Sequence, residues 1–287
     1  MTVKQRPLEV KRAVAIRFWS KAERLHEEIT RNHSYDKCVQ LSHRALRWFI
    51  YLEKMTFSKN VEDRLFAAEQ LPKFLEQTGR LHLHNMHKGR EVEVLASDPE
   101  ILVQTTFLKG LCTPNNAANH LDLLNKIVCC TEEPEILETL GTELAKTIKN
   151  SSVDETLRTA MTKVLINVFF TANNAKFDSV IKIIETELYG LNREILIRPI
   201  TMFLTELSNR LKAAGEEAMI RDSMILTMIV IVDLAAEKHI IETAAELTEL
   251  YNYSSVPEQL KRTIQKALMK FGSYALTPDA ETLKIQN

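Results

Sequence analysis

Four asparagines recur at a nearly constant interval from residue 125 onward. Each follows a leucine by two positions, and successive asparagines are 42, 42 and 43 residues apart. The four are Asn125, Asn167, Asn209 and Asn252. A fixed period between about 20 and 50 residues is typical of a solenoid, in which one supersecondary unit is repeated and stacked. The period constrains the fold strongly, because each unit must bury its apolar face against its neighbours.

Apolar residues recur every three or four positions through most of the chain, which predicts amphipathic helices. One such stripe consists of Leu137, Leu140, Leu144 and Ile148. Seven glycines and eight prolines in 287 residues are few for a sandwich or barrel, which needs a turn about every 8–12 residues. Ser-x-x-Glu sequences, which can form capping boxes at helix starts, begin at Ser97, Ser152 and Ser255. We therefore expect an all-α chain.

The helical stripes and their breaks predict an order of elements. We expect outer helices near 98–112, 133–149, 176–190, 216–237 and 256–272, and inner helices near 116–131, 152–172, 193–213 and 238–253. Three longer helices near 8–30, 35–56 and 60–77 precede them, and 78–97 is the predicted linker. The predicted organisation is a basic helical cap over 1–90, repeats of about 42 residues over 91–272, and a frayed tail over 273–287.

One segment also resembles a known repeat family. The stretch 153–165 places Asp154, Arg158, Ala160 and Leu165 as in the Asp…Val-Arg…Ala…Leu pattern of armadillo and HEAT repeats. The 42-residue interval and the Leu-x-Asn-x-Leu element are more similar to the armadillo form. The resemblance covers about 98–272. It implies a right-handed α-α superhelix, an armadillo/HEAT-like solenoid, here with a three-helix N-terminal cap.

The asparagines are expected to face away from the core. An α-helix turns about 100° per residue, so the leucine two positions earlier lies on the opposite side. Stacked inner helices would then bring the four carboxamides into a row. Residues that flank this row or lie one turn away are Leu121, Lys163, Phe170 and Met202.

In some armadillo proteins such a ladder holds the main chain of an extended partner, because a carboxamide both donates and accepts hydrogen bonds. The resemblance implies the same role for the four asparagines, with the flanking residues completing the partner-binding surface. The alternative is that they are surface asparagines tolerated inside helices. Nuclear-import adaptors of this family carry a tryptophan four residues before the asparagine, whereas this chain has Leu121, Lys163, Thr205 and Thr248. Basic localisation signals are therefore not the expected cargo.

Charge is distributed unevenly. The net charge is −1, but residues 1–90 carry 18 Lys and Arg against 10 Asp and Glu. A candidate basic patch on the first two helices consists of Arg17, Lys21, Arg24, Arg44 and Arg47. Arginines close to aromatic residues such as Trp48 can bind the phosphates and bases of nucleic acids, and an anionic membrane surface is a related target. The other interpretations are electrostatic self-complementarity and a solvated charged cap.

Other features narrow the classes of function. The four cysteines have no framework spacing, which predicts reduced thiols in a cytoplasmic or nuclear protein. No secretory or membrane-spanning segment is expected. His82, His84 and His87 have a metal-like composition but no evident fourth ligand, so we expect loop histidines without metal, with a metal-assisted enzyme as the alternative.

No phosphate loop, nucleophile elbow or His-Glu-x-x-His motif occurs, so neither an enzyme nor a cofactor is predicted. The sequence predicts a non-enzymatic adaptor or scaffold that binds another protein along the groove of the inner helices. Binding of nucleic acid or an anionic surface by the N-terminal helices is the alternative.

Overall fold

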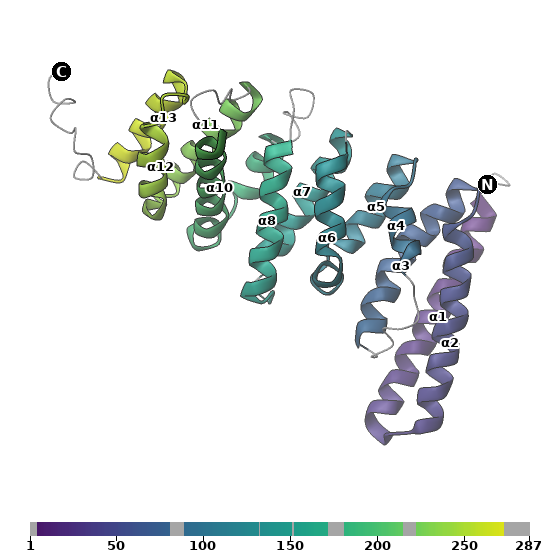
Figure 1. Ribbon diagram of the computed structural model, residues 1–287. Coiled ribbons are helices and arrows are strands. Elements are labelled where there is room, and N and C mark those ends of the chain that lie inside the picture. The colour runs from purple at the N-terminus through teal and green to yellow at the C-terminus, as the bar shows by residue number, and fades with distance from the viewer. Residues whose placement is uncertain are drawn as a thin grey trace, which may run out of the picture. The chain divides into compact units, whose positions relative to one another are not determined.

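A computed structural model describes residues 5–80, 89–131, 133–150, 152–171, 181–214 and 222–272 (Figure 1). All regular structure in these ranges is helical, so the prediction of an all-α chain is confirmed. The chain forms two compact units, residues 1–123 and 124–287, and each is described by itself. No helix within the described ranges has the length and apolar character needed to cross a bilayer.

The first unit begins with three long helices. Its elements are α1 (Gln5–Asn32), α2 (Tyr35–Thr56), α3 (Val61–Arg80), α4 (Arg90–Ala96), α5 (Ile101–Leu111) and the start of α6 (Pro114–Cys130), which is kinked at His120. The predicted linker over 78–97 is therefore wrong in part, because α4 lies within it. Gly89 adopts a left-handed conformation (φ 80°) just before α4. The side chains of Val92, Leu95 and Ala96, on this short helix, are buried.

An aromatic cluster forms the core between α1, α2 and α3. The Trp48 ring stacks on Phe18 at 4.7 Å and on Tyr51 at 5.5 Å between centroids. Phe66 of α3 packs edge-on against Trp48. The indole N–H of Trp19 donates to Oε1 of Gln70 on α3 at 3.1 Å. Both tryptophans of the chain thus help to hold the first three helices together.

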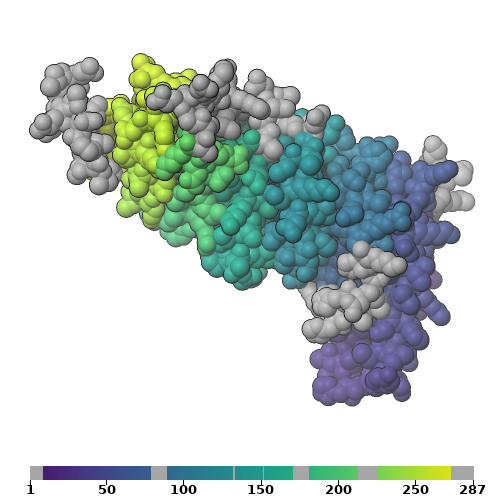
Figure 2. Space-filling model, in the orientation of Figure 1, coloured from purple at the N-terminus to yellow at the C-terminus, as the bar shows by residue number. Residues whose placement is uncertain are grey.

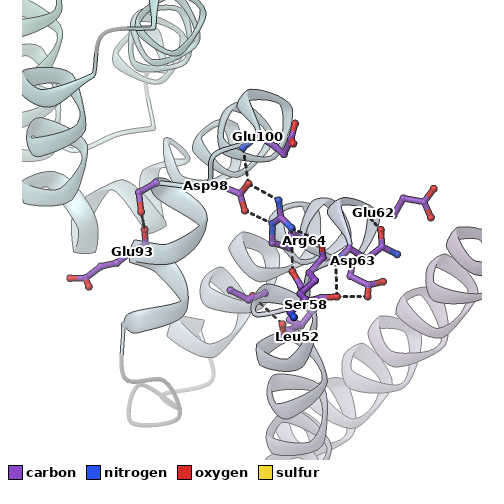
Figure 3. Close-up of polar contacts among 12 residues, drawn as sticks. Leu52, Ser58, Glu62, Asp63, Arg64, Glu93, Asp98 and Glu100 are labelled. Carbon is purple, nitrogen blue, oxygen red and sulfur yellow. Dashed lines mark hydrogen bonds and ion pairs between the residues drawn. The ribbon is translucent and has the colours of Figure 1, made fainter.

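A buried ion pair connects α3 to the start of α5 (Figure 3). Nε of Arg64 lies 2.7 Å from Oδ2 of Asp98, and the Asp98 side chain is only 1% exposed. Oδ1 of Asp98 also accepts the backbone N–H of Glu100 at 2.9 Å. Hydrogen bonding to Asp98 raises the pKa of Arg64. This carboxylate therefore fixes the turn that precedes α5.

The helix starts use aspartates where the sequence predicts serines. Oγ of Ser97 donates backwards to the carbonyl of Glu93, so it does not cap α5. Before α8 (Glu155–Thr171), Oδ1 of Asp154 accepts the backbone N–H of Leu157 at 3.0 Å. α13 starts after Pro257 with no side-chain cap. The three predicted serine capping boxes are therefore wrong.

The second unit contains shorter helices. After the end of α6 come α7 (Pro134–Lys149), α8 (Glu155–Thr171), the π-helical turn η2 (Ile184–Leu188), α10 (Arg193–Ala214), α11 (Asp222–Glu237), the 3-10 turn η4 (Ile241–Thr243), α12 (Ala244–Tyr251) and α13 (Glu258–Lys270). The predicted inner helix over 238–253 is shorter, because η4 takes its first part. The predicted helix over 176–190 lies partly outside the described residues, and the predicted tail over 273–287 wholly so.

Packing in the second unit is between neighbours. α7 packs on α8, α10 contacts both α8 and α12, and α11 packs on α13 (Figure 1). On the surface, the colours follow one another in chain order through this unit, so each strip of surface comes from residues close in sequence (Figure 2). The core is mainly aliphatic, with Leu137, Leu140 and Leu144 fully buried.

Two ion pairs of the second unit join residues that are separated by nearly the same interval as the asparagines. Lys182 pairs with Glu138, 44 positions earlier, and Arg198 pairs with Glu155, 43 positions earlier. All four side chains are substantially exposed. These pairs connect successive helical pairs at the surface, while the aliphatic residues connect them inside.

Candidate partner-binding groove

Three of the four asparagines lie on separate helices of the second unit. Asn125 is near the end of α6, Asn167 on α8 and Asn209 on α10. Asn209 is exposed and the other two are half-buried, whereas Leu165 and Leu207 are buried in the core. The leucines therefore anchor α8 and α10 while the opposite side of each helix presents its carboxamide.

A direct hydrogen bond joins the first two asparagines. Nδ2 of Asn167 donates to Oδ1 of Asn125 at 2.6 Å, across 42 positions of sequence. Two asparagines of the series found in the sequence thus meet side chain to side chain.

A groove of about 480 Å³ continues from this point between α8 and α10. It is called the amide groove here and is lined by Lys163, Ile166, Asn167, Thr201, Met202, Thr205, Glu206 and Asn209. The structure thus brings together Asn167, Asn209, Lys163 and Met202 among the residues predicted from sequence. The groove offers two carboxamides, one cation, one carboxylate and apolar surface. Such a lining can pair with backbone groups and accept a side chain.

Phe170 is placed differently from the prediction. Its ring stacks on the ring of Phe203, with 5.0 Å between the centroids. The guanidinium of Arg210, which lies on α10, is 4.0 Å from the centroid of the Phe170 ring. Nε of Arg210 is held in turn by Oε1 of Glu206 at 2.9 Å. Phe170 therefore supports the groove wall and is not among its lining residues.

Sequence reasoning missed Glu206, which both lines the amide groove and fixes Arg210. The helical spacing of four residues between Glu206 and Arg210 was the available signal. Thr201 was also missed. Leu121, the remaining flanking residue, is half-buried and belongs to the first unit.

The fourth asparagine is not part of the amide groove. Asn252 is exposed and forms the C-cap of α12, because this helix ends at Tyr251. Between α10 and α12 an ion pair of Lys212 with Glu249 is found instead. Its hydrogen bond lowers the pKa of Glu249 and raises that of Lys212. The row of amides therefore extends over α6, α8 and α10.

The predicted basic residues gather in a second groove, between α1 and α2 of the first unit. This groove, called the basic groove, has a volume of about 730 Å³. It is lined by Val14, Arg17, Phe18, Lys21, Gln40, His43, Arg44, Arg47, Trp48 and Tyr51. Four of the five predicted cations are included. Arg24, the fifth, is exposed further along α1 and does not line the groove.

Neither groove resembles a metal centre. In the part of the chain that the structure describes, no three His, Cys, Asp or Glu side chains are grouped so that they could hold a metal ion. His82, His84 and His87 lie outside that part. The four cysteines form no disulfide, and Cys112 is buried.

Comparison of the chain with protein-family models, with curated proteins and with solved structures gives no match. Function therefore has to be argued from the two grooves themselves.

Proposed function

We propose that the chain is a non-enzymatic adaptor of the armadillo/HEAT-like solenoid type, which binds an extended segment of another protein in the amide groove. The observation that carries this proposal is the hydrogen bond between Asn167 and Asn125, because it joins two asparagines that are 42 positions apart, the interval proposed for the repeat. The surface ion pairs 43 and 44 positions apart support the same repeat interval. A right-handed superhelix is the stacking that this interval and the resemblance favour.

An extended segment suits the chemistry of this groove. The backbone N–H and C=O groups of an extended segment have no hydrogen-bond partners within the segment. Each carboxamide of the groove can donate to a backbone C=O and accept from a backbone N–H. Asn167 and Asn209 would set the register of the segment. Ile166 and Met202 supply apolar surface for one of its side chains, since both line the same groove.

Charge in the amide groove favours a mixed partner over a strongly charged one. Lys163 and Glu206 both line it, and the carboxylate of Glu206 is already engaged by Arg210. A segment with a single acidic residue next to apolar residues would match this lining. Its one carboxylate would pair with Lys163, and its apolar residues would contact the apolar part of the groove. Hydrogen bonds and apolar contact would then supply most of the affinity.

The test is a double variant, Asn167→Ala with Asn209→Ala. Peptides are first selected from a random display library on the unchanged chain, and their affinity is then measured by fluorescence anisotropy. Loss of two hydrogen bonds, each contributing about 1 kcal/mol, should weaken binding about 10- to 30-fold. The melting temperature should stay within a few degrees, because Asn209 is exposed and the hydrogen bond lost between Asn167 and Asn125 contributes only about 0.5–1.5 kcal/mol.

Asn252→Ala is the matched control, since it removes a carboxamide outside the amide groove. It should bind the selected peptides as the unchanged chain does. Equal affinity of the double variant and the control would remove the amide groove as the docking site.

A further inference from the structure

We infer that the basic groove is a separate binding site for single-stranded nucleic acid, held chiefly through its phosphates. The site lies on other helices than the amide groove and goes beyond the proposed adaptor role. Four observations on the first unit lead to it.

The first observation is that the positive charges of the basic groove have no carboxylate beside them on its lining. Arg17, Lys21, Arg44 and Arg47 line the basic groove, and no carboxylate does. Four other cations of this unit do have acidic partners. These pairs are Lys11 with Asp63, Arg12 with Glu69, Lys37 with Glu28 and Arg64 with Asp98. Within the ranges described, no ion pair is found for the four groove cations. Their mutual repulsion is retained in the fold, and an anionic ligand would relieve it.

The second observation is the arrangement of these cations. Arg17 and Lys21 are four positions apart on α1, and Arg44 and Arg47 are three apart on α2. At a rise of about 1.5 Å per residue, each pair spans roughly one helical turn, about 5–6 Å. Each of the two helices therefore presents two cations to the basic groove. Three of the four are arginines, whose planar guanidinium binds phosphate oxygens in a bidentate manner.

The third observation is an apolar floor beneath the cations. Trp48 is 4% exposed and stacks between the half-buried rings of Phe18 and Tyr51. The partly exposed rings and Val14 leave apolar surface inside the groove. Unpaired bases can pack on such surface whatever their sequence, because every base has a π face.

The fourth observation is that the opposite side of the same hairpin differs. A smaller cavity of about 260 Å³, which Phe18 lines as well, includes the carboxylates of Glu23 and Glu27. Positive charge is thus concentrated on one side of α1 and α2. A solvated cap with evenly mixed charge would not produce this separation.

The usual spacing of packed helices favours a single strand over a duplex. Axes of packed helices lie about 8–10 Å apart, less than the about 12 Å width of the major groove of a DNA duplex alone. A duplex could offer phosphates to the rim only, and its bases, stacked on each other, could not reach the floor. A flexible single strand can enter, with phosphates at the cations and bases over the aromatic rings.

The experiment measures anisotropy of a labelled mixed-sequence RNA of about 20 nucleotides, long enough for one such site, on the full chain. Neutralising four phosphates should give a slope of about −3 in log affinity against log salt, hence an about 50-fold loss between about 50 and 200 mM salt. Arg44→Gln with Arg47→Gln should halve that slope and weaken binding at least about tenfold. The same RNA in a duplex should bind more weakly than the single strand.

The matched control is Lys59→Gln with Lys73→Gln, which removes the same charge from exposed positions of the same unit that do not line the groove. It should leave affinity and slope almost unchanged. Arg17→Gln with Lys21→Gln, on the other helix, repeats the test should the first variant not fold. The variant Asn167→Ala with Asn209→Ala should bind RNA normally, which separates this site from the proposed adaptor function.

Three results would overturn the inference. The first is no binding at about 50 mM salt, where phosphate contacts are strong. The second is an equal loss in the groove and control variants, which indicates general attraction to a basic surface. The third is displacement of the RNA by polyglutamate at equal charge concentration, which would assign the groove to an acidic protein segment.

Discussion

The two units of this chain are built from the same kind of helix but handle charge in opposite ways. In the first unit, Arg64 and Asp98 form a buried ion pair, while the cations of the basic groove have no acidic partner on its lining. In the second unit, ion pairs such as Arg198 with Glu155 are exposed, and the amide groove carries charges of both signs. The binding chemistry of a helical surface therefore depends on which of its charges are left without a partner. One groove should be sensitive to salt and the other nearly insensitive.

The cores differ as well. Aromatic rings fill the space between α1, α2 and α3, whereas aliphatic residues fill that between α7 and α8. Since the chain has two tryptophans and both lie in the first unit, their fluorescence reports on that unit alone. This makes the comparison between the units directly measurable.

The largest expected effect follows from removing one partner of the buried ion pair. Asp98→Ala leaves the guanidinium of Arg64, whose side chain is 13% exposed, without its carboxylate and the N–H of Glu100 without its acceptor. Breaking a buried pair in this way costs about 3–5 kcal/mol. We expect the tryptophan-monitored unfolding midpoint in urea to fall sharply.

The control for this variant is Glu100→Ala, which changes an exposed neighbouring carboxylate and should stay within about 0.5 kcal/mol. Hydrogen exchange of α8 and α10 should be the same in both variants. An unchanged tryptophan midpoint in Asp98→Ala would mean that the ion pair does not hold the first unit together.

A smaller effect distinguishes two close helix contacts. A Cβ added at Gly110 would lie 2.5 Å from Cβ of Pro72, part of a rigid ring on α3. A Cβ added at Gly141 would overlap only Cδ1 of Ile183, the end of a flexible side chain. Gly110→Ala should destabilise the first unit by about 1–2 kcal/mol, because overpacking of about 1–3 kcal/mol exceeds the helix-propensity gain.

Gly141→Ala should be nearly neutral, because Ile183 can change rotamer and the propensity gain of about 1 kcal/mol offsets the strain. Gly190→Ala is the control, since nothing lies within 4 Å of its added Cβ. Urea unfolding measures the change in stability of all three variants. It is followed by tryptophan fluorescence for Gly110→Ala and by circular dichroism for Gly141→Ala and Gly190→Ala. A larger cost at Gly141 than at Gly110 would reverse this account of the two contacts.

Much of the fold could be predicted from the sequence, because periodicity is a local property. The helix expected at 35–56 has the observed bounds, and the leucines before Asn167 and Asn209 are buried. What sequence reasoning missed depends on contacts between distant residues. The pairing of Arg64 with Asp98 and the stacking of Arg210 on Phe170 are set by packing, which no local pattern encodes.

The two candidate sites differed in how far they could be predicted. Composition indicated the basic groove, and geometry then excluded Arg24 from its lining. The period indicated the amide row, but the early end of α12 moved Asn252 to a helix terminus. Serine was predicted as the cap before α8, but the carboxylate of Asp154 reaches the N–H of Leu157.

The contact between asparagines tests whether the amide row is also structural. Asn125→Ala removes the acceptor of the Asn167 amide, in a half-buried position. A hydrogen bond of this kind contributes about 0.5–1.5 kcal/mol. Thermal unfolding monitored by circular dichroism should therefore shift down slightly, whereas exposed Asn209→Ala should leave it unchanged. Identical curves for both variants would make the row a binding feature only.

The smallest expected effect concerns the exposed pair of Lys212 and Glu249, whose side chains are 51% and 41% exposed. Because the pKa of Glu249 is lowered by Lys212, the pair stabilises the folded chain above pH 4.5, the ordinary glutamate value. The contribution is lost as the pH falls through the lower folded-state pKa. At high pH, the raised pKa of Lys212 means that the pair keeps its stabilising contribution up to pH 10.5, the ordinary lysine value. The contribution is lost as the pH rises further, through the raised folded-state pKa of Lys212.

Glu249→Gln should therefore lower the melting temperature slightly at neutral pH and not at all well below pH 4.5. The difference should also shrink as salt is added, because exposed pairs are screened. Asp98→Ala, in contrast, should keep its full cost in salt, since its partner is buried. If Glu249→Gln instead shows a salt-independent cost at every pH, the second unit relies on buried charge as the first does, and the contrast between the two units no longer holds.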